Sequence, residues 1–171
     1  MTETLSDAVP DHVDRAVDEV LKSACAQELM LVTAESCTGG LLASILTDMS
    51  GQAHAFERGF VTYTNDAKAE MLGVDRALLD DPGPVSEPVA RAMAEGALKN
   101  SRGHISLSIT GFAGPAGPED EPGLVHFGLA RRGGATMHRC EHFASEDRGF
   151  VRLRCLETGL EMLRVALDEA G

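Results

Sequence analysis

Short apolar runs of strand type alternate with amphipathic helical segments along this chain of 171 residues. In the helical segments, apolar residues recur every three or four positions, which predicts one buried face on each helix. Alternating strands and helices favour a sheet with helices packed on both of its faces. The sequence therefore predicts a single three-layer α/β/α domain over residues 1–171, with a mixed, mostly parallel sheet and a mobile N-terminal tail over residues 1–10.

Turn and capping signals set the expected limits of these elements. Helices are predicted over residues 10–27, 41–49, 65–73 and 86–98 and from about Glu146 onward, strands over 29–34, 58–64 and 104–110, and a hairpin over 124–131 and 136–143. Asn65 or Asp66 is the expected cap of the third helix, which places Lys68 in its first turns. The segment 111–123, rich in Gly and Pro, is expected to form a long loop, and such loops are often functional.

One strand-to-helix turn, residues 33–40 (TAESCTGG), carries the chemistry expected of an active site. It places the hydroxyl of Ser36 between an apolar strand and an amphipathic helix. The first N–H groups of that helix have no partner within it, so we expect them to face Ser36 and to stabilise an oxyanion or a phosphate. The alternative is that Ser36 or Thr38 only caps the helix and that Gly39 and Gly40 only permit a tight turn.

The overall charge limits the partners. A net charge of −12 repels nucleic acid and anionic membranes, so neither partner is expected, and an anionic ligand needs a local Arg or Lys. No apolar run approaches the ~20 residues that cross a bilayer, and residues 1–14 are polar and acidic, unlike a signal peptide. The scattered cysteines are expected to be reduced thiols. These features predict a cytoplasmic protein.

Four ordered segments resemble a known family. They are residues 34–40 (AESCTGG), 58–68 (RGFVTYTNDAK), 85–86 (VS) and 109–115 (ITGFAGP). The chain resembles the CinA C-terminal domain family of nicotinamide mononucleotide deamidases from about residue 10 to its C-terminus. The resemblance implies hydrolysis of the nicotinamide carboxamide to the acid, with release of ammonia, in pyridine nucleotide salvage. It also implies a catalytic pair, carried here by Ser36 and Lys68, a pyridine nucleotide as substrate, and no metal or cofactor.

The expected chemistry depends on the protonation of Lys68. An amide carbon needs a nucleophile stronger than neutral serine, so a base must take the proton of Ser36 and later protonate the departing ammonia. Lys68 can do both only when it is neutral, so its pKa must fall by several units from ~10.4 through burial or a nearby cation. Arg58 is the candidate cation. Backbone N–H groups of residues 38–40 are expected to hold the oxyanion.

Other residues are expected to bind the substrate. Arg148 and Arg152 lie one helical turn apart near the start of the last helix; Arg148, which matches a family arginine, is the first choice for the phosphate. Thr110 and Gly111 are expected at the carboxamide or ribose, unless the glycine only provides backbone freedom. The single tyrosine, Tyr63, either stacks on the pyridine ring or orients the catalytic lysine by hydrogen bonding, with plain packing as the alternative.

Side chains with sulfur or nitrogen donors suggest two further candidate sites, a second nucleophile and a metal site. Cys37 adjoins the proposed nucleophile, and we expect a packed thiol rather than a second nucleophile. The hairpin carries a set of metal-binding residue types, namely His126, His138, Cys140 and His142. A two-residue turn at Gly133-Gly134 would place His126 opposite Glu141, on the other face of the hairpin from the remaining histidines. The sequence therefore predicts exposed strand histidines and no metal site.

The chain departs from the family at several points. The family loop usually carries Lys-Pro-Val-Gly, whereas Glu121-Pro122-Gly123 is shorter and lacks the lysine, and Ala144-Ser145 replaces a common Gly-Asp pair. Larger relatives carry a separate N-terminal domain, so a stand-alone domain is expected here. The last helix has a wide apolar face that suits burial, including a contact between subunits of a homo-oligomer. The alternative function is a non-catalytic nucleotide-binding module linked to competence or damage responses.

Overall fold

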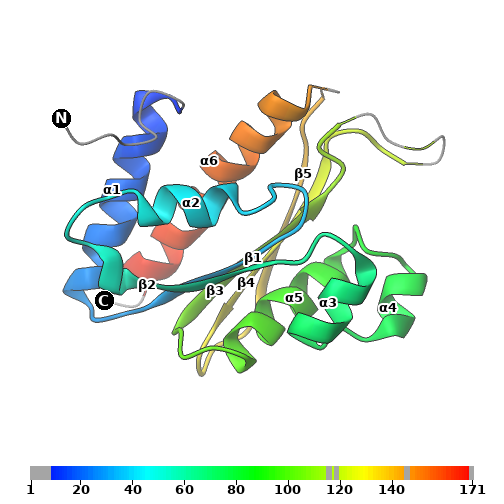
Figure 1. Cartoon of the computed structure of the whole chain (residues 1–171), viewed down its shortest axis with the longest axis horizontal. Helices are drawn as coiled ribbons and strands as arrows, with labels where there is room; N and C mark the ends of the chain where they lie inside the picture. Colours follow the sequence, from blue (N-terminus) through cyan, green and yellow to red (C-terminus); the bar gives the residue numbers. More distant parts are fainter. Residues whose placement is uncertain (1–8, 115–116, 118–119, 145–146, 170–171) are drawn as a thin grey trace.

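A five-stranded sheet forms the centre of the protein (Figure 1). The computed structural model describes residues 9–114, 117, 120–144 and 147–169. The strands are β1 (Leu31–Glu35), β2 (Phe56–Val61), β3 (Ile105–Gly111), β4 (Leu124–Arg131) and β5 (Met137–His142), in the spatial order β2-β1-β3-β4-β5. β1 pairs in parallel with β2 and β3, and β4 is antiparallel to both β3 and β5. β4 thus runs against the other strands, which confirms the mixed, mostly parallel sheet.

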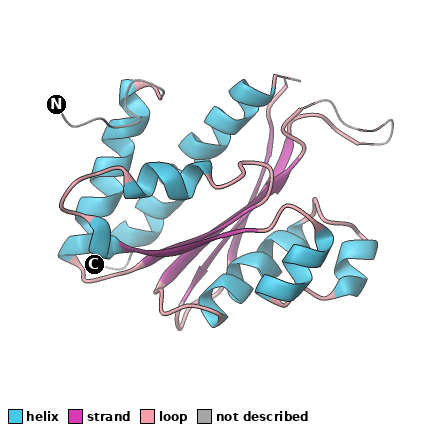
Figure 2. Cartoon of the chain, viewed as in Figure 1, coloured by secondary structure: helices cyan, strands magenta, loops and turns pink. Residues whose placement is uncertain are grey.

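Helices cover both faces of the sheet, which confirms the predicted three-layer architecture (Figures 1 and 2). One layer holds α1 (Asp11–Ala26), α2 (Leu41–Thr47) and α6 (Arg148–Asp168), and the other holds α3 (Asn65–Leu72), α4 (Arg76–Asp80) and α5 (Glu87–Lys99). A short 3₁₀ helix, η2 (Ala53–Ala55), precedes β2. α1 packs on α6, and α5 packs on β3 and β4. None of the helices in the described ranges is long and apolar enough to cross a membrane.

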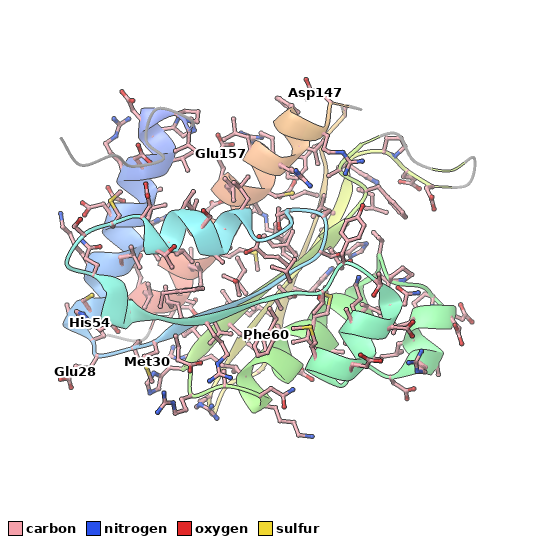
Figure 3. The ribbon with its side chains drawn as sticks, viewed as in Figure 1. Glu28, Met30, His54, Phe60, Asp147 and Glu157 are labelled. Atoms are coloured by element: carbon pink, nitrogen blue, oxygen red, sulfur yellow. The ribbon has the colours of Figure 1, made fainter. Side chains whose placement is uncertain are left out.

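The hydrophobic pattern explains the two cores. The buried face of α1 is the predicted one, formed by Val13, Val17, Val20, Leu21 and Ala24. The wide apolar face of α6 is buried in the same core, against α1 and the sheet, so the domain itself accounts for it. On the other face of the sheet, Phe60, labelled in Figure 3, packs with Leu72 and Met93 of the α3–α5 layer. β3 is buried along almost its whole length, as expected for an inner strand.

The helix starts differ from the sequence expectations in local detail. α3 is capped by Thr64, whose Oγ1 accepts from the amide of Ala67 at 3.1 Å, and not by Asn65 or Asp66. α4 was not predicted, because its five residues are too few to show a period. Asp147, labelled in Figure 3, caps α6 by accepting from the amides of residues 149 and 150. The predicted tail at residues 1–8 and the predicted start of the last helix at residue 146 lie outside the described residues.

The predicted register of the hairpin is wrong by one residue. β4 ends at Arg131 and β5 begins at Met137, so residues 132–136 connect the strands in place of a two-residue turn. His126 therefore pairs with Cys140, not with Glu141. A slip of one residue moves a side chain to the other face of a sheet.

The corrected register brings two histidines together. Nδ1 of His126 lies 2.9 Å from Nε2 of His138, and the two rings stack on one face of the hairpin. Both rings are half-buried, whereas His142 is exposed, so the prediction of exposed strand histidines holds only for His142. Within the described part of the chain, no group of three or more His, Cys, Asp or Glu side chains has the geometry to hold a metal ion.

The close contact between β4 and α5 provides a test of how tightly the sheet packs against its helices. A Cβ atom on Gly128 would lie 2.3 Å from the carbonyl oxygen of Ala90 and 2.7 Å from Oγ of Ser108. We therefore predict that Gly128→Ala lowers the free energy of unfolding by about 1–3 kcal/mol or more, as overpacking does. The control is Gly134→Ala in the hairpin connection, where the nearest atom lies at 3.7 Å. Urea unfolding followed by circular dichroism measures both variants, and equal stabilities would contradict the prediction.

Candidate active site

A cavity of about 280 Å³ opens at the carboxyl ends of β1, β2 and β3. Five segments that are distant in sequence contribute its lining: the turn after β1, the segment from β2 into α3, the segment before α5, the end of β3 with the residues after it, and the first residue of α6. The lining residues are Ser36, Cys37, Tyr63, Asn65, Lys68, Pro84, Val85, Thr110, Gly111, Phe112, Ala113, Gly114 and Arg148. Ligands of α/β proteins bind at this edge of the sheet.

Lys68 and Ser36 meet inside this cavity. Nζ of Lys68 lies 3.1 Å from Oγ of Ser36, and it donates to the carbonyl oxygens of Thr62 at 3.0 Å and Tyr63 at 3.4 Å. The parallel pairing of β1 with β2 produces this contact, because it aligns Glu35 with Val61 and so brings the segments that follow the two strands together. A nucleophile and a base within hydrogen-bond reach are the minimum arrangement for covalent catalysis.

The environment of Lys68 favours its neutral form. The residue is only 2% exposed, and burial lowers the pKa of its amine below the usual value, because a charged ammonium loses its hydration there. A neutral amine has two protons and one lone pair. The two carbonyl oxygens can accept the protons, which leaves the lone pair facing Oγ of Ser36.

Arg58 does not assist this shift, which corrects the sequence expectation. It pairs with Val32 along the sheet, three residues before the end of β2. Its guanidinium forms an ion pair with Glu57 at 2.7 Å and donates to the carbonyl oxygen of Asn100 at 3.1 Å, on the surface. Burial, rather than a neighbouring cation, therefore lowers the pKa of Lys68.

The N-terminus of α2 is not open to the substrate, which is a second correction. The carboxylate of Glu35, 0% exposed, accepts from the amides of Gly40 at 3.2 Å, Leu42 at 3.1 Å and Ala43 at 2.8 Å, and from the hydroxyl of Thr38 at 2.7 Å. They include the amide of Gly40 and the first amides of α2, which the sequence assigned to an oxyanion or a phosphate. The protein's own carboxylate therefore occupies this anion site.

Three predicted substrate-binding residues, Thr38, Gly39 and Gly40, shape the turn and lie outside the cavity lining. Gly39 and Gly40 have φ of 63° and 93°, a left-handed conformation that favours glycine. The amide of Gly39 donates to the carbonyl oxygen of Ser36 at 3.1 Å. Among the described residues, the amides of Cys37 and Thr38 donate to no other residue. These two amides are the donors of the turn that the carboxylate of Glu35 leaves unused.

The two predicted phosphate ligands have different surroundings. Arg148 lines the cavity, and its guanidinium lies against Gly114, where an added Cβ would meet it at 2.9 Å. Nε of Arg152 instead donates to the carbonyl oxygen of Cys37 at 2.9 Å, outside the lining. Of the two, only Arg148 has a guanidinium in the cavity, and Arg152 supports the nucleophile turn from α6.

Tyr63 lies at the mouth of the cavity. Its side chain is 62% exposed, which excludes the plain packing role, and its carbonyl oxygen, not its phenol, contacts Lys68. The ring is therefore free to lie against a bound ligand. Asn65, two residues on, also lines the cavity. The sequence indicated this residue only as a helix cap, so its place in the cavity was not predicted.

The far wall comes from the end of β3. The hydroxyl of Thr110 donates to the carbonyl oxygen of Pro84 at 2.8 Å, which ties β3 to the segment before α5. A Cβ on Gly111 would lie 2.7 Å from the carbonyl oxygen of Leu124, so this glycine is required by its close approach to β4. Both residues line the cavity, and a ligand can reach their remaining surface.

Cys37 is a packed thiol, as expected. It is buried in the core beside Cys155 of α6, and both are free cysteines. A hydrogen bond from the Cys155 thiol lowers the pKa of Cys37, with a smaller contribution from the charge of Arg152. Both partners lie on α6, more than a hundred residues away in sequence.

The fold and this site define a three-layer α/β protein with a buried serine–lysine pair at the carboxyl edge of its sheet. The CinA C-terminal domain family matches residues 13–167, and the chain belongs to this family.

Its relatives match over nearly the whole chain. Nicotinamide-nucleotide amidohydrolase PncC of Escherichia coli K12 is 44% identical over 161 residues, which cover 93% of this chain and 95% of that protein. A CinA-like protein of Chlorobaculum tepidum is 44% identical over 84% of this chain, which is 35% of that longer protein. Among solved structures, the competence/damage inducible protein CihA from Agrobacterium tumefaciens superposes with a TM-score of 0.89 and 41% identity, covering 94% of this chain and 98% of that one.

The lowered pKa of Lys68 makes the stability of the protein depend on pH. In the unfolded chain the amine titrates near 10.5, and in the folded protein it titrates lower, so the unfolded state binds more protons between the two values. We predict that the free energy of unfolding of the wild type, relative to Lys68→Met, rises with pH through this window. Urea unfolding of both proteins between about pH 7 and pH 10 tests this. A flat or falling difference would show that burial does not lower this pKa.

Proposed function

We propose that this protein hydrolyses the carboxamide of nicotinamide mononucleotide to nicotinic acid mononucleotide and ammonia. The contact that carries the proposal is the one between Nζ of Lys68 and Oγ of Ser36, 3.1 Å apart in the cavity. A pocket that only binds a nucleotide has no use for a buried lysine amine on a serine hydroxyl, so this contact favours catalysis over the non-catalytic alternative. A relative that is 44% identical over 93% of this chain is named as an amidohydrolase of nicotinamide nucleotides.

The proposed reaction has two halves. In the first, the lone pair of Lys68 takes the proton of Ser36, and Oγ attacks the carboxamide carbon. The tetrahedral oxyanion accepts hydrogen bonds from the amides of Cys37 and Thr38. Lys68 then gives its proton to the departing nitrogen, so that ammonia leaves and a nicotinoyl ester remains on Ser36. In the second half, Lys68 activates a water, which hydrolyses the ester and releases the acid.

The remaining cavity residues fit the rest of the substrate. Tyr63 at the mouth offers its ring to the pyridine, and Arg148 offers its guanidinium to the phosphate. No step needs a metal or a cofactor. The free cysteines at residues 25, 37, 140 and 155 suit the cytoplasm, where thiols stay reduced and where pyridine nucleotide salvage would take place. Assembly of copies of the chain into a homo-oligomer is part of the proposal and stays a prediction.

The first test removes each member of the pair. We predict that Ser36→Ala and Lys68→Ala each abolish ammonia release from nicotinamide mononucleotide, because one loses the nucleophile and the other loses the base. Circular dichroism and calorimetric binding of the nucleotide check that the fold and the cavity persist. Wild-type rates in either variant would exclude the pair from the reaction.

The second test addresses the phosphate. Arg148→Ala should lower kcat/KM for nicotinamide mononucleotide much more than for the dephosphorylated riboside, because only the nucleotide loses a charge-assisted contact of about 1.5–3 kcal/mol. Both substrates present the same amide to the nucleophile, so damage to the catalytic pair would slow both equally.

Arg164→Ala is the matched control for this second test, since Arg164 also lies on α6 but pairs with Asp168 on the surface. It should change neither rate. Equal losses on the two substrates in Arg148→Ala would place the phosphate site elsewhere.

A further inference from the structure

Glu35 is the buried charge nearest in sequence to the nucleophile, and the proposed reaction does not use it. It is the last residue of β1, it precedes Ser36 directly, and its carboxylate is fully buried. Among the described residues, no Lys, Arg or His forms an ion pair with it. An unpaired buried carboxylate is costly unless hydrogen bonds satisfy its oxygens. The hydrogen bonds that this carboxylate accepts therefore decide whether the position can hold a charge.

All four donors to Glu35 come from the chain that directly follows Ser36. Oε2 accepts from the hydroxyl of Thr38 and the amides of Gly40 and Leu42, and Oε1 accepts from the amide of Ala43. The carboxylate thus closes residues 35–43 into a compact loop with the nucleophile at its start. The N-cap residue of α2 is a glycine, which has no side chain to take these amides.

The backbone on either side of Glu35 is fixed to the sheet. The amide of Ser36 donates to the carbonyl oxygen of Ile109 on β3 at 3.0 Å, and the carbonyl oxygen of Glu35 accepts from the amide of Thr62 at 2.8 Å. The same Thr62 holds Nζ of Lys68 through its own carbonyl oxygen. One rigid frame therefore connects the side chain of Glu35, the nucleophile and the base.

We propose that Glu35 is a positioning residue of the catalytic site. Its carboxylate draws the amides of α2 back into the protein, which aims Oγ of Ser36 at Lys68 and leaves the amides of Cys37 and Thr38 for the oxyanion. It also neutralises the positive end of α2, so that the phosphate of a substrate is attracted to Arg148 and not to the nucleophile turn. This inference rests on the proposed function.

The test is Glu35→Gln, which keeps the shape of the side chain. The glutamine oxygen can still accept at the position of Oε2, but its NH₂ group meets the amide of Ala43, which is also a donor. The loop must shift, and a shift of about 1 Å at a reacting group costs about 10²-fold in rate. We expect kcat for ammonia release to fall about 10²-fold. KM should stay within a factor of about three, because Tyr63 and Arg148, on other segments, bind the substrate.

Two further readouts separate positioning from plain stability. The acidic limb of the kcat/KM profile reports the protonation of Lys68 and should keep its midpoint in Glu35→Gln, because the base itself is intact. Glu35→Asp keeps the charge on a shorter side chain and should restore part of the lost kcat. The matched controls are Val17→Ala, which removes buried volume from α1, and Asp75→Ala, which removes the cap of α4. Both should lower stability without lowering kcat.

Labelling of Ser36 by a fluorophosphonate gives an answer that does not depend on the nucleotide. We expect the labelling rate to fall in Glu35→Gln together with kcat. If the wild type releases no ammonia from nicotinamide mononucleotide, the proposed function fails, and the labelling rate still tests Glu35. A wild-type labelling rate or kcat in Glu35→Gln would overturn the inference. The inference would also be overturned if Val17→Ala, at equal stability, lost as much kcat as Glu35→Gln. It would be overturned as well if Glu35→Gln changed only KM.

Discussion

A lysine amine held out of water is the constraint that the proposed site depends on. Moving an ammonium group into the protein interior is unfavourable, and the free energy of folding must cover either that cost or the cost of losing its proton. The fold places Nζ of Lys68 among the carbonyl oxygens of residues 62 and 63 and the hydroxyl of Ser36. These groups satisfy a neutral amine completely. Burial of this amine thus lowers its pKa, which is what the proposed base requires.

The parallel pairing of β1 with β2 and β3 brings the site together. All three strands end at the same edge, so the segments that follow them meet there, although they are far apart in sequence. β4 and β5 complete the sheet on one side, and α6 begins at the same edge, with Arg148 as its first residue (Figure 1). The contact between Ser36 and Lys68 therefore depends on the pairing of β1 with β2.

The sequence predicted the features that depend on local periodicity. It did not predict the contacts that depend on segments distant in sequence. The buried face of α1 and the position of Lys68 early in α3 follow from short-range pattern, and the contact of Lys68 with Ser36 entered through the family resemblance. The burial of Glu35 was missed because a glutamate before a serine gives no sign of it. Arg58 was placed beside the lysine because it is near in sequence, whereas extended β2 carries it to the surface. The hairpin register failed because one residue in the connection decides it.

Two of the arginines of α6 have a consequence for the length of the substrate. Arg152 holds the carbonyl oxygen beside the nucleophile, and Arg148, one turn earlier on the same rigid helix, reaches the cavity. If Arg148 takes the phosphate as proposed, one helix fixes the span between the phosphate and the amide carbon, and α6 acts as a ruler. On this proposal, a nicotinamide compound whose phosphate lies at a different distance from its amide carbon does not satisfy both ends at once. Selectivity for that span then depends on the fixed position of Arg148 on a helix.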